Sequence, residues 1–237
     1  IPLITRICYY LAMAEDFSLV QRLDVIREIC AGKRVLHLGC TNYPYTEDSI
    51  KNNMLLHHDL EKIASDVWGI DSDKKGIEIL ESHGSKQIVC GDLERLDELD
   101  LEQDFDIILA GEMIEHLNNP GLFLNGIKRF MNAKTQLVLT TVNAYCGMRF
   151  VWYGLRGKRG KIEFVHPDHV AYYSYSTLKV LLERHGLHVG SFLFYDIGRE
   201  HRPHNKWFIN TINNICVAIA PQWADGVIAV CSLPSDQ

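Results

Sequence analysis

The sequence predicts a single α/β domain in which helices cover both faces of a mostly parallel, seven-stranded sheet. Short continuous apolar runs recur along the chain, and helical periodicity fills the gaps between them. No repeat or low-complexity linker divides the sequence. A chain of 237 residues with 47% hydrophobic content is long enough for one well-packed core. We therefore expect residues 1–237 to form one domain.

The expected strands are short, β-rich apolar runs. They span residues 34–38, 66–71, 86–90, 105–110, 136–142, 187–195 and 226–231. Strands separated by helices imply right-handed crossovers, which make neighbouring strands parallel. The sheet is therefore expected to be Rossmann-like. Such a sheet binds ligands at the carboxyl ends of its strands, near the point where the strand order switches.

Helical periodicity is clearest in three segments between these strands, which are residues 73–83, 120–131 and 176–185. Gly84 and Gly186 follow two of them, where glycine suits a helix end, and Pro120 opens the third. Residues 1–30 form an N-terminal segment that is predicted to be helical from about residue 3. It either caps the active site or lies on the edge of the sheet.

Two later segments are harder to assign. Residues 143–173 hold aromatic, glycine and basic residues without clear periodicity, and we expect a lid or substrate-binding segment there. The C-terminal part, residues 174–237, includes an apolar stretch at 205–220 that predicts an inserted helix. This helix belongs to the core, to an oligomer contact or to the substrate wall.

Charge and hydropathy exclude some classes of protein. The formal net charge is −6, from 24 basic and 30 acidic residues, which argues against a nucleic-acid partner. The basic residues Arg156, Lys158, Arg159 and Lys161 form the one basic cluster, either a solvated loop or an arm that meets an anionic substrate such as a phosphate. No apolar run approaches the roughly 20 residues that span a membrane.

The cysteines indicate the redox compartment. None of the seven forms a C-x-x-C pair, and several lie in apolar runs. This pattern fits reduced, mostly buried thiols, so we expect a cytoplasmic protein without a disulfide framework. Arg6 interrupts the apolar stretch at residues 1–14, so no signal peptide is expected.

The first strand ends in a glycine, within residues 35–40 (V-L-H-L-G-C). Gly39 allows a sharp turn and lets the backbone approach a ligand closely. The run resembles the first motif of the class I S-adenosylmethionine-dependent methyltransferases, V-L-D-L-G-C-G-x-G, with His37 at the usual acidic position. In that family the loop contacts the methionine part of the cofactor. The resemblance implies this role for His37, Gly39 and Cys40.

The next two strands end in acidic residues at the places where this family binds the nucleoside. Asp71, followed by Ser72, closes the second strand, and a carboxylate there can accept hydrogen bonds from ribose hydroxyls. Gly91, Asp92 and Leu93 follow the third strand. The resemblance implies that Asp92 accepts from the adenine amine and that the backbone N–H of Leu93 faces a ring nitrogen.

The fourth strand carries the most specific motif in the chain. Residues 105–117 follow the pattern F-D-x-I-x-x-x-E-x-x-E-H-L, which resembles the ubiquinone-type branch of the methyltransferases. The resemblance spans about residues 32–189 and implies that residues 32–142 form the cofactor-binding core. Gly111 and Glu112 would lie beside the cofactor. An NAD-dependent enzyme would require G-x-G-x-x-G after the first strand, and that run is absent.

Acidic and imidazole groups are expected to enter the cleft where the methyl group is transferred. His116 is the leading general base, because its ordinary pKa near 6.5 suits proton transfer at neutral pH. Glu112 and Glu115 would orient it or hold substrate hydroxyls. His166 and His169, in the run H-P-D-H, are expected to return to this cleft.

The same groups resemble the metal ligands of the small-RNA 3′-end methyltransferases. Carboxylate and imidazole ligands suit several divalent cations. Because the acidic balance of the chain argues against RNA, we expect S-adenosylmethionine as the cofactor, S-adenosylhomocysteine as its product, and no metal.

The expected function is therefore O- or N-methylation of a small molecule such as a sugar, a polyketide or a quinone-like ring. One alternative is a metal-dependent RNA 3′-terminal 2′-O-methyltransferase. Another is a non-catalytic module that binds S-adenosylmethionine, because Thr41 and Tyr43 replace two motif glycines. The sequence predicts no particular oligomeric state.

Overall fold

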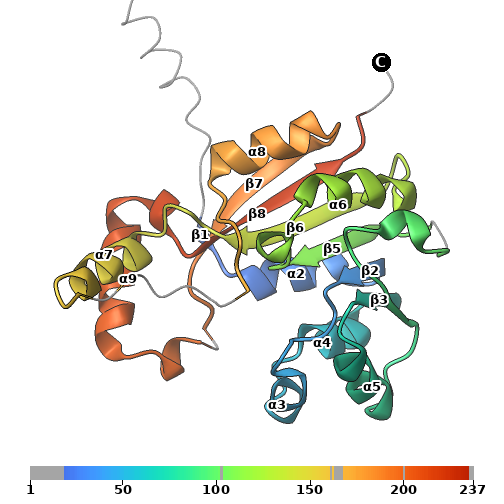
Figure 1. The fold of residues 1–237 in the computed structure, drawn as a ribbon, viewed down its shortest axis with the longest axis horizontal. Coiled ribbons are helices and arrows are strands. Elements are labelled where there is room, and N and C mark those ends of the chain that lie inside the picture. Colours follow the sequence, from blue (N-terminus) through green and yellow to red (C-terminus); the bar gives the residue numbers. More distant parts are fainter. Residues whose placement is uncertain (1–18, 102–103, 161, 163–167, 200, 235–237) are drawn as a thin grey trace, which may run out of the picture.

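A computed structural model describes residues 19–101, 104–160, 162, 168–199 and 201–234. It contains one eight-stranded sheet in the order β1-β7-β8-β6-β5-β2-β3-β4, with helices on both sides (Figure 1). The predicted α/β architecture is confirmed, and all seven predicted strands are present. The eighth is β1, a two-residue strand that forms one edge of the sheet and pairs with β7.

The strands have the following bounds: β1 Leu19–Val20, β2 Arg34–Leu38, β3 Asp66–Asp71, β4 Ile88–Cys90, β5 Ile107–Gly111, β6 Gln136–Val142, β7 His188–Tyr195 and β8 Gly226–Ser232. The α-helices are α2 Arg22–Cys30, α3 Thr46–Lys51, α4 Leu56–Ile63, α5 Lys74–Ser82, α6 Pro120–Ile127, α7 Gly147–Gly157, α8 Tyr175–Arg184 and α9 Trp207–Ile219.

Alternating side chains along the central strands build a core on each face of the sheet. In β5, Ile108 belongs to the larger cluster and Ile107 and Leu109 to the smaller one. Helices α6 and α8 cover the first face, whereas α2 and α4 supply Ile26 and Leu60 to the second. Because a strand buried on both faces must be apolar at every position, this packing explains the continuous apolar runs.

The chain changes direction across the sheet between β2 and β5. From β2 it proceeds through β3 to β4 on one side, and from β5 to β6 on the other, with parallel pairing throughout. Strand β8 is antiparallel to both β6 and β7. The β2–β5 boundary is therefore the switch point at which a ligand cleft is expected.

The local signals at helix ends account for several of these boundaries. Pro120 lies in the first turn of α6, as predicted. Ser174 caps α8 by accepting a hydrogen bond from the backbone N–H of Thr177, whose side chain completes a capping box. Gly84 follows the end of α5 with φ of +97°, a conformation that L side chains rarely adopt.

Three expectations need correction. The N-terminal segment is not helical from end to end: among its described residues, 19–20 form a strand and only 22–30 a helix, while 1–18 lie outside the described residues. Residues 143–173 are not irregular throughout, because α7 occupies 147–157. Helix α9 forms as predicted, but it buries only Asn213 and Cys216, so most of it stands outside the core.

Helices α7 and α9 pack together at one end of the molecule, beyond β6 (Figure 1). The rings of Trp152 and Phe208 lie 5.2 Å apart at this contact. Within the described part of the chain, all six cysteines are free and five of them are buried. No described helix combines the length and the apolar character that crossing a membrane requires.

A pair of buried histidines lies beneath the carboxyl end of β2. Nδ1 of His37 is 3.2 Å from Nδ1 of His57 in α4, so one imidazole must donate and the other accept. Burial lowers the pKa of both rings, that of His57 to about 4. The neighbouring His57 lowers the pKa of His37 further, and His58 lowers that of His57. Glu61 is 3.7 Å from Nε2 of His57, beyond hydrogen-bond distance. The folded protein therefore keeps both rings neutral.

We predict that acid destabilises the protein through this pair. The unfolded state protonates His57 near pH 6.5 and the folded state only near pH 4, so stability is complete above pH 6.5 and is lost as the pH falls toward 4. His57 alone contributes roughly 3 kcal/mol over this range. Urea unfolding at several pH values should show a weaker pH dependence for His57→Leu than for the wild type. Identical pH dependence in the two proteins would contradict the prediction.

Candidate active site

A cavity of about 860 Å³ opens at the carboxyl edge of the sheet, where β2 and β5 meet. Residues that follow β2, β3, β4 and β5 line it, together with Arg22 from α2. The volume lies within the range of small-molecule and cofactor sites. Twelve of the predicted site residues contribute to the wall: His37, Gly39, Cys40, Asp71, Ser72, Asp92, Leu93, Gly111, Glu112, Glu115, His116 and His169.

Two predicted residues do not contribute to this wall. Gly91 is not among the lining residues: a Cβ there would lie 2.8 Å from a methyl carbon of Leu99, so a side chain is excluded by packing. A role for Gly91 in binding the cofactor stays a prediction. His166 lies outside the described residues, so the run H-P-D-H is represented by Asp168 and His169.

Asp71 holds the loop that follows β2. Its Oδ2 accepts hydrogen bonds from the backbone N–H and the hydroxyl of Thr41, at 2.9 and 2.8 Å, and its Oδ1 accepts from the N–H of Asp73 at 2.9 Å. Gly39 turns this loop with φ of +70°. Thr41, which replaces a motif glycine, therefore uses its hydroxyl to tie the loop to the neighbouring strand.

The residues after β4 have a more open environment. Asp92 is exposed, and its Oδ1 accepts a hydrogen bond from the backbone N–H of Glu94 at 2.8 Å. Leu93 is half-buried beside it, and both line the cavity. The second carboxylate oxygen of Asp92 is thus available to a ligand group that donates a hydrogen bond.

Glu112 connects three elements at the end of β5. Its Oε1 accepts a 2.6 Å hydrogen bond from the hydroxyl of Tyr195 in β7, and Nη1 of Arg22 lies 3.6 Å from its Oε2. Arg22 in turn donates from Nε to the hydroxyl of Thr140, at 2.9 Å. The backbone of Glu112 has φ of +52°, and its N–H donates to the carbonyl of Thr140.

Charges around Glu112 keep it ionised. Burial raises the pKa of its carboxyl, but Arg22 and the Tyr195 hydrogen bond outweigh that effect and hold the pKa below 4.5. Burial and the nearby Glu112 charge raise the pKa of the Tyr195 phenol well above 10, so it stays protonated and can donate. Gly226 leaves room for this ring, because a Cβ there would lie 2.0 Å from Cζ of Tyr195.

The pKa of Glu115 is shifted in the opposite direction to that of Glu112. It is fully buried, and burial followed by the charge of Glu112 raises its pKa to about 7. Its Oε2 accepts a 2.8 Å hydrogen bond from the hydroxyl of Thr141, whereas Oε1 has no hydrogen-bond partner among the described residues. The site therefore contains one carboxylate held in the charged form and one that titrates near neutrality.

The backbone of Glu115 brings a distant segment to the site. Its carbonyl accepts hydrogen bonds from the N–H groups of Val170 and Ala171, at 2.9 and 3.3 Å. This contact places the ring of His169 with its centre 4.7 Å from that of His116. The structure thus places His169 of this run in the cavity wall.

Glu115, His116 and His169 could also hold a metal ion. One potential ligand atom from each lies within 4.8 Å of the others. One carboxylate and two imidazoles are a ligand set that several divalent cations accept. Glu112 belonged to the expected set, but it is not part of this group, because its carboxylate points to Tyr195 and Arg22.

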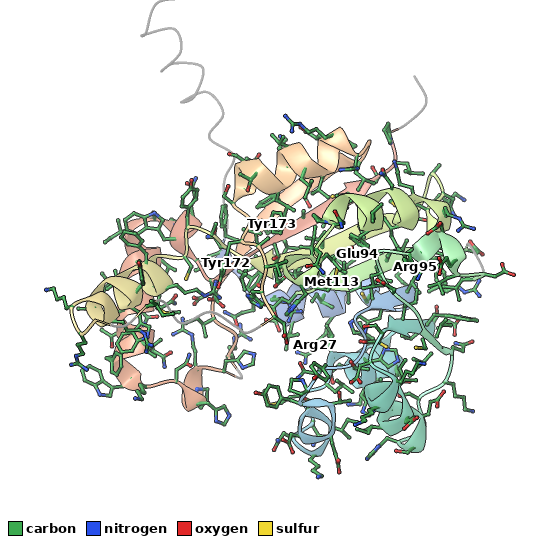
Figure 2. All side chains as sticks on the ribbon, in the orientation of Figure 1. Arg27, Glu94, Arg95, Met113, Tyr172 and Tyr173 are labelled. Carbon is green, nitrogen blue, oxygen red and sulfur yellow. The ribbon has the colours of Figure 1, made fainter. Side chains whose placement is uncertain are left out.

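Two residues that hold Glu112 carry no recognisable signal in the sequence: Arg22, which lines the cavity, and Tyr195, which is not among its lining residues. Arg22 meets the hydroxyl of Thr140, 118 residues away, and Tyr195 meets Glu112, 83 residues away. Nothing in a helix of the N-terminal segment or in a C-terminal strand indicates such contacts. Met113 and His201 also line the cavity (Met113 is labelled in Figure 2). Of these, only Met113 lies within the recognised motif of the fourth strand.

Comparisons with known proteins agree with this arrangement. A family model described as a methyltransferase domain matches residues 19–191. Ubiquinone biosynthesis O-methyltransferase of Bradyrhizobium diazoefficiens is 28% identical over 167 residues, which cover 66% of this chain and 62% of that protein. The enzyme of the same name from Coxiella burnetii is 27% identical, over 66% of this chain and 68% of that protein.

Solved structures show the same fold. A SAM dependent methyltransferase from Archaeoglobus fulgidus superposes with a TM-score of 0.55 at 18% identity, over 94% of this chain and 99% of that one. The [4+2]-cyclase SpnF superposes with a TM-score of 0.55 at 15% identity, over 90% of this chain and 81% of that one. Because one of these neighbours is named a cyclase, the fold by itself does not determine the reaction.

The chain therefore belongs to the methyltransferase domain family, among the class I S-adenosylmethionine-dependent methyltransferases. It spans about three fifths of the length of the Bradyrhizobium protein that it matches. These likenesses establish the family and the fold, whereas the reaction and the acceptor depend on the residues of the site.

We predict that the Tyr195–Glu112 hydrogen bond stabilises the fold at this edge of the sheet. Tyr195→Phe and Glu112→Ala should each destabilise the protein. A double-mutant cycle from urea unfolding should give a coupling free energy of about 1–3 kcal/mol, as expected for a hydrogen bond to a charged group. Strictly additive effects, within about 0.5 kcal/mol, would show that the bond contributes nothing.

Proposed function

We propose that the chain is an S-adenosylmethionine-dependent O- or N-methyltransferase that acts on a small-molecule acceptor. One observation carries this proposal: the cavity at the switch point brings together a carboxylate at the end of β3, an ion pair after β5 and two histidines. The first two suit a nucleoside and a zwitterionic amino acid. The histidines suit removal of a proton from an acceptor.

The residues present fit S-adenosylmethionine by their chemistry. Asp92 can accept from the adenine amine, and Asp71 can accept from a ribose hydroxyl. Arg22 and Glu112 offer one charge of each sign, which complements the carboxylate and the ammonium of a methionine group. Gly39, without a side chain, leaves the backbone accessible beside Met113.

The Asp71 carboxylate has few hydrogen-bond acceptor positions left for a ligand. A carboxylate offers about four acceptor positions, and Thr41 and Asp73 use three of them. We infer that Oδ1 accepts one ribose hydroxyl and that the hydroxyl of Thr41 rotates away when the second one binds. Thr41 thereby compensates for the missing glycine of the motif without blocking the site.

The bound cofactor supplies an electrophilic methyl group, with the sulfonium as leaving group. The task of this chain is to align the acceptor and to take its proton. His116 lies at the cavity wall, where an imidazole can receive a proton from an acceptor hydroxyl or amine. The ring of His169 packs edge-to-face with that of His116, and Glu115 lies beside both rings.

We predict that Asp71→Ala weakens cofactor binding by tenfold or more, about 1.4 kcal/mol. The variant loses the ribose acceptor and also releases the Thr41 loop. Calorimetric titration with S-adenosylhomocysteine measures the dissociation constant.

Two controls separate the causes. Thr41→Val removes one bond to the loop but keeps the carboxylate, so it should change affinity much less. Asp66→Ala, at the other end of β3, should leave affinity unchanged. An unaltered dissociation constant for Asp71→Ala would show that the ribose does not bind there.

We predict that His116→Ala lowers turnover by about 10²–10⁴-fold while S-adenosylmethionine binds almost as before. The variant lacks the group that removes the acceptor proton, but it keeps the nucleoside site. Single-turnover rates and calorimetry give the two quantities, with His83→Ala on the exposed end of α5 as control. Undiminished turnover would show that another group acts as base or that none is needed.

Metal use is tested by the same assay. We expect turnover without a metal, so EDTA should leave the wild-type rate unchanged. The spacing of Glu115, His116 and His169 favours the alternative of a divalent cation that lowers the pKa of an acceptor hydroxyl. In that case EDTA abolishes turnover, Mg²⁺ or Mn²⁺ restores it, and His169→Ala is as damaging as His116→Ala.

A further inference from the structure

A second cavity of about 550 Å³ lies under helices α7 and α9, beyond the carboxyl end of β6. Its walls are mainly apolar: Trp152 and Tyr153 contribute from α7, and Ile209 contributes from α9. Phe150 also lines it, although 77% of that side chain is exposed, so the aromatic residues surround an entrance as well as an interior.

The charged groups in this wall are already paired with each other. Arg149 donates from Nη2 to Oδ1 of Asp225 at 2.8 Å, and from Nη1 to the backbone carbonyl of Asp225 at 3.2 Å. Asp225 in turn holds the pKa of Arg149 above its ordinary value, despite its burial. The cavity therefore presents a closed ion pair and apolar surface, which favours an apolar occupant over a charged one.

The second cavity shares a wall residue with the first. His201 lines both cavities. Tyr172 lines the second, and its ring centre is 5.8 Å from that of His169, which lines the first. In the view of Figure 2, Tyr172 lies between Met113 and the α7–α9 pair. A molecule of moderate length can therefore occupy both cavities, with one end near His116 and the other under α7.

We propose that the second cavity binds an apolar ring or alkyl chain of the acceptor, whose reactive hydroxyl or amine lies in the first cavity. The identity of the reactive end rests on the proposed methyltransferase function. The position and apolar character of the other end rest on the second cavity. It selects an amphiphilic acceptor over a sugar, because a wall that is mainly apolar offers too few partners for the several hydroxyls of a sugar.

The test uses 4-alkylphenols with ethyl, butyl and hexyl chains as probes, titrated into the wild-type chain by calorimetry. Each buried methylene should increase the affinity about fourfold, with one molecule bound per chain. Ile209→Trp fills the cavity and should abolish this dependence on chain length. Ile215→Trp, on the exposed side of the same helix, is the matched control and should retain it.

Titration with S-adenosylhomocysteine separates this inference from the proposed function. Ile209→Trp should bind it as the wild type does, which also shows that the variant is folded. A wild-type affinity that is independent of chain length overturns the inference, as do equal losses in the two tryptophan variants. Chain-length dependence in a protein that fails to bind S-adenosylhomocysteine would support the apolar cavity and contradict the methyltransferase proposal.

Discussion

The parallel pairing of β2 with β5 is the constraint on which the rest of the site depends. These strands are not adjacent in sequence, yet His37 pairs with Leu109 and Leu38 with Ala110. Their carboxyl ends consequently meet at one edge, where the Gly39 turn and Glu112 face the same cavity. Successive side chains of each strand enter opposite cores, and this packing fixes the register, because a shift by one residue would exchange the side chains of the two cores.

Electrostatics then give the two carboxylates after β5 different roles. Glu112 lies beside Arg22 and accepts from Tyr195, so it stays charged. Glu115, three positions later, is buried near that charge, so its pKa rises to about 7. A site with one fixed charge and one group that titrates near neutrality can bind a charged ligand while it moves protons. The close spacing of Glu115 with His116 and His169 is why this group also resembles a cation site.

The sequence predicted the sheet well because buried parallel strands are nearly unbroken apolar runs, and the same strands located the ligand edge. It predicted Asp71 and the β5 motif as site residues because both lie at or just after a strand end, where such a sheet binds its ligand. It did not reveal Arg22 or Tyr195, since their contacts join residues roughly a hundred positions apart. Helix α7 was missed because it contains Gly147, Gly154 and Gly157, and glycine is a poor helix former.

The central claim is that the nucleoside and the methionine of one cofactor lie along the carboxyl edge from β4 to β5. A crystal structure with S-adenosylhomocysteine tests it most directly. The account predicts the ribose within hydrogen-bond distance of Oδ1 of Asp71, the amino-acid end between Gly39 and Arg22, and open space from the sulfur toward His116. A nucleoside bound elsewhere, or a sulfur turned away from the histidines, would contradict it.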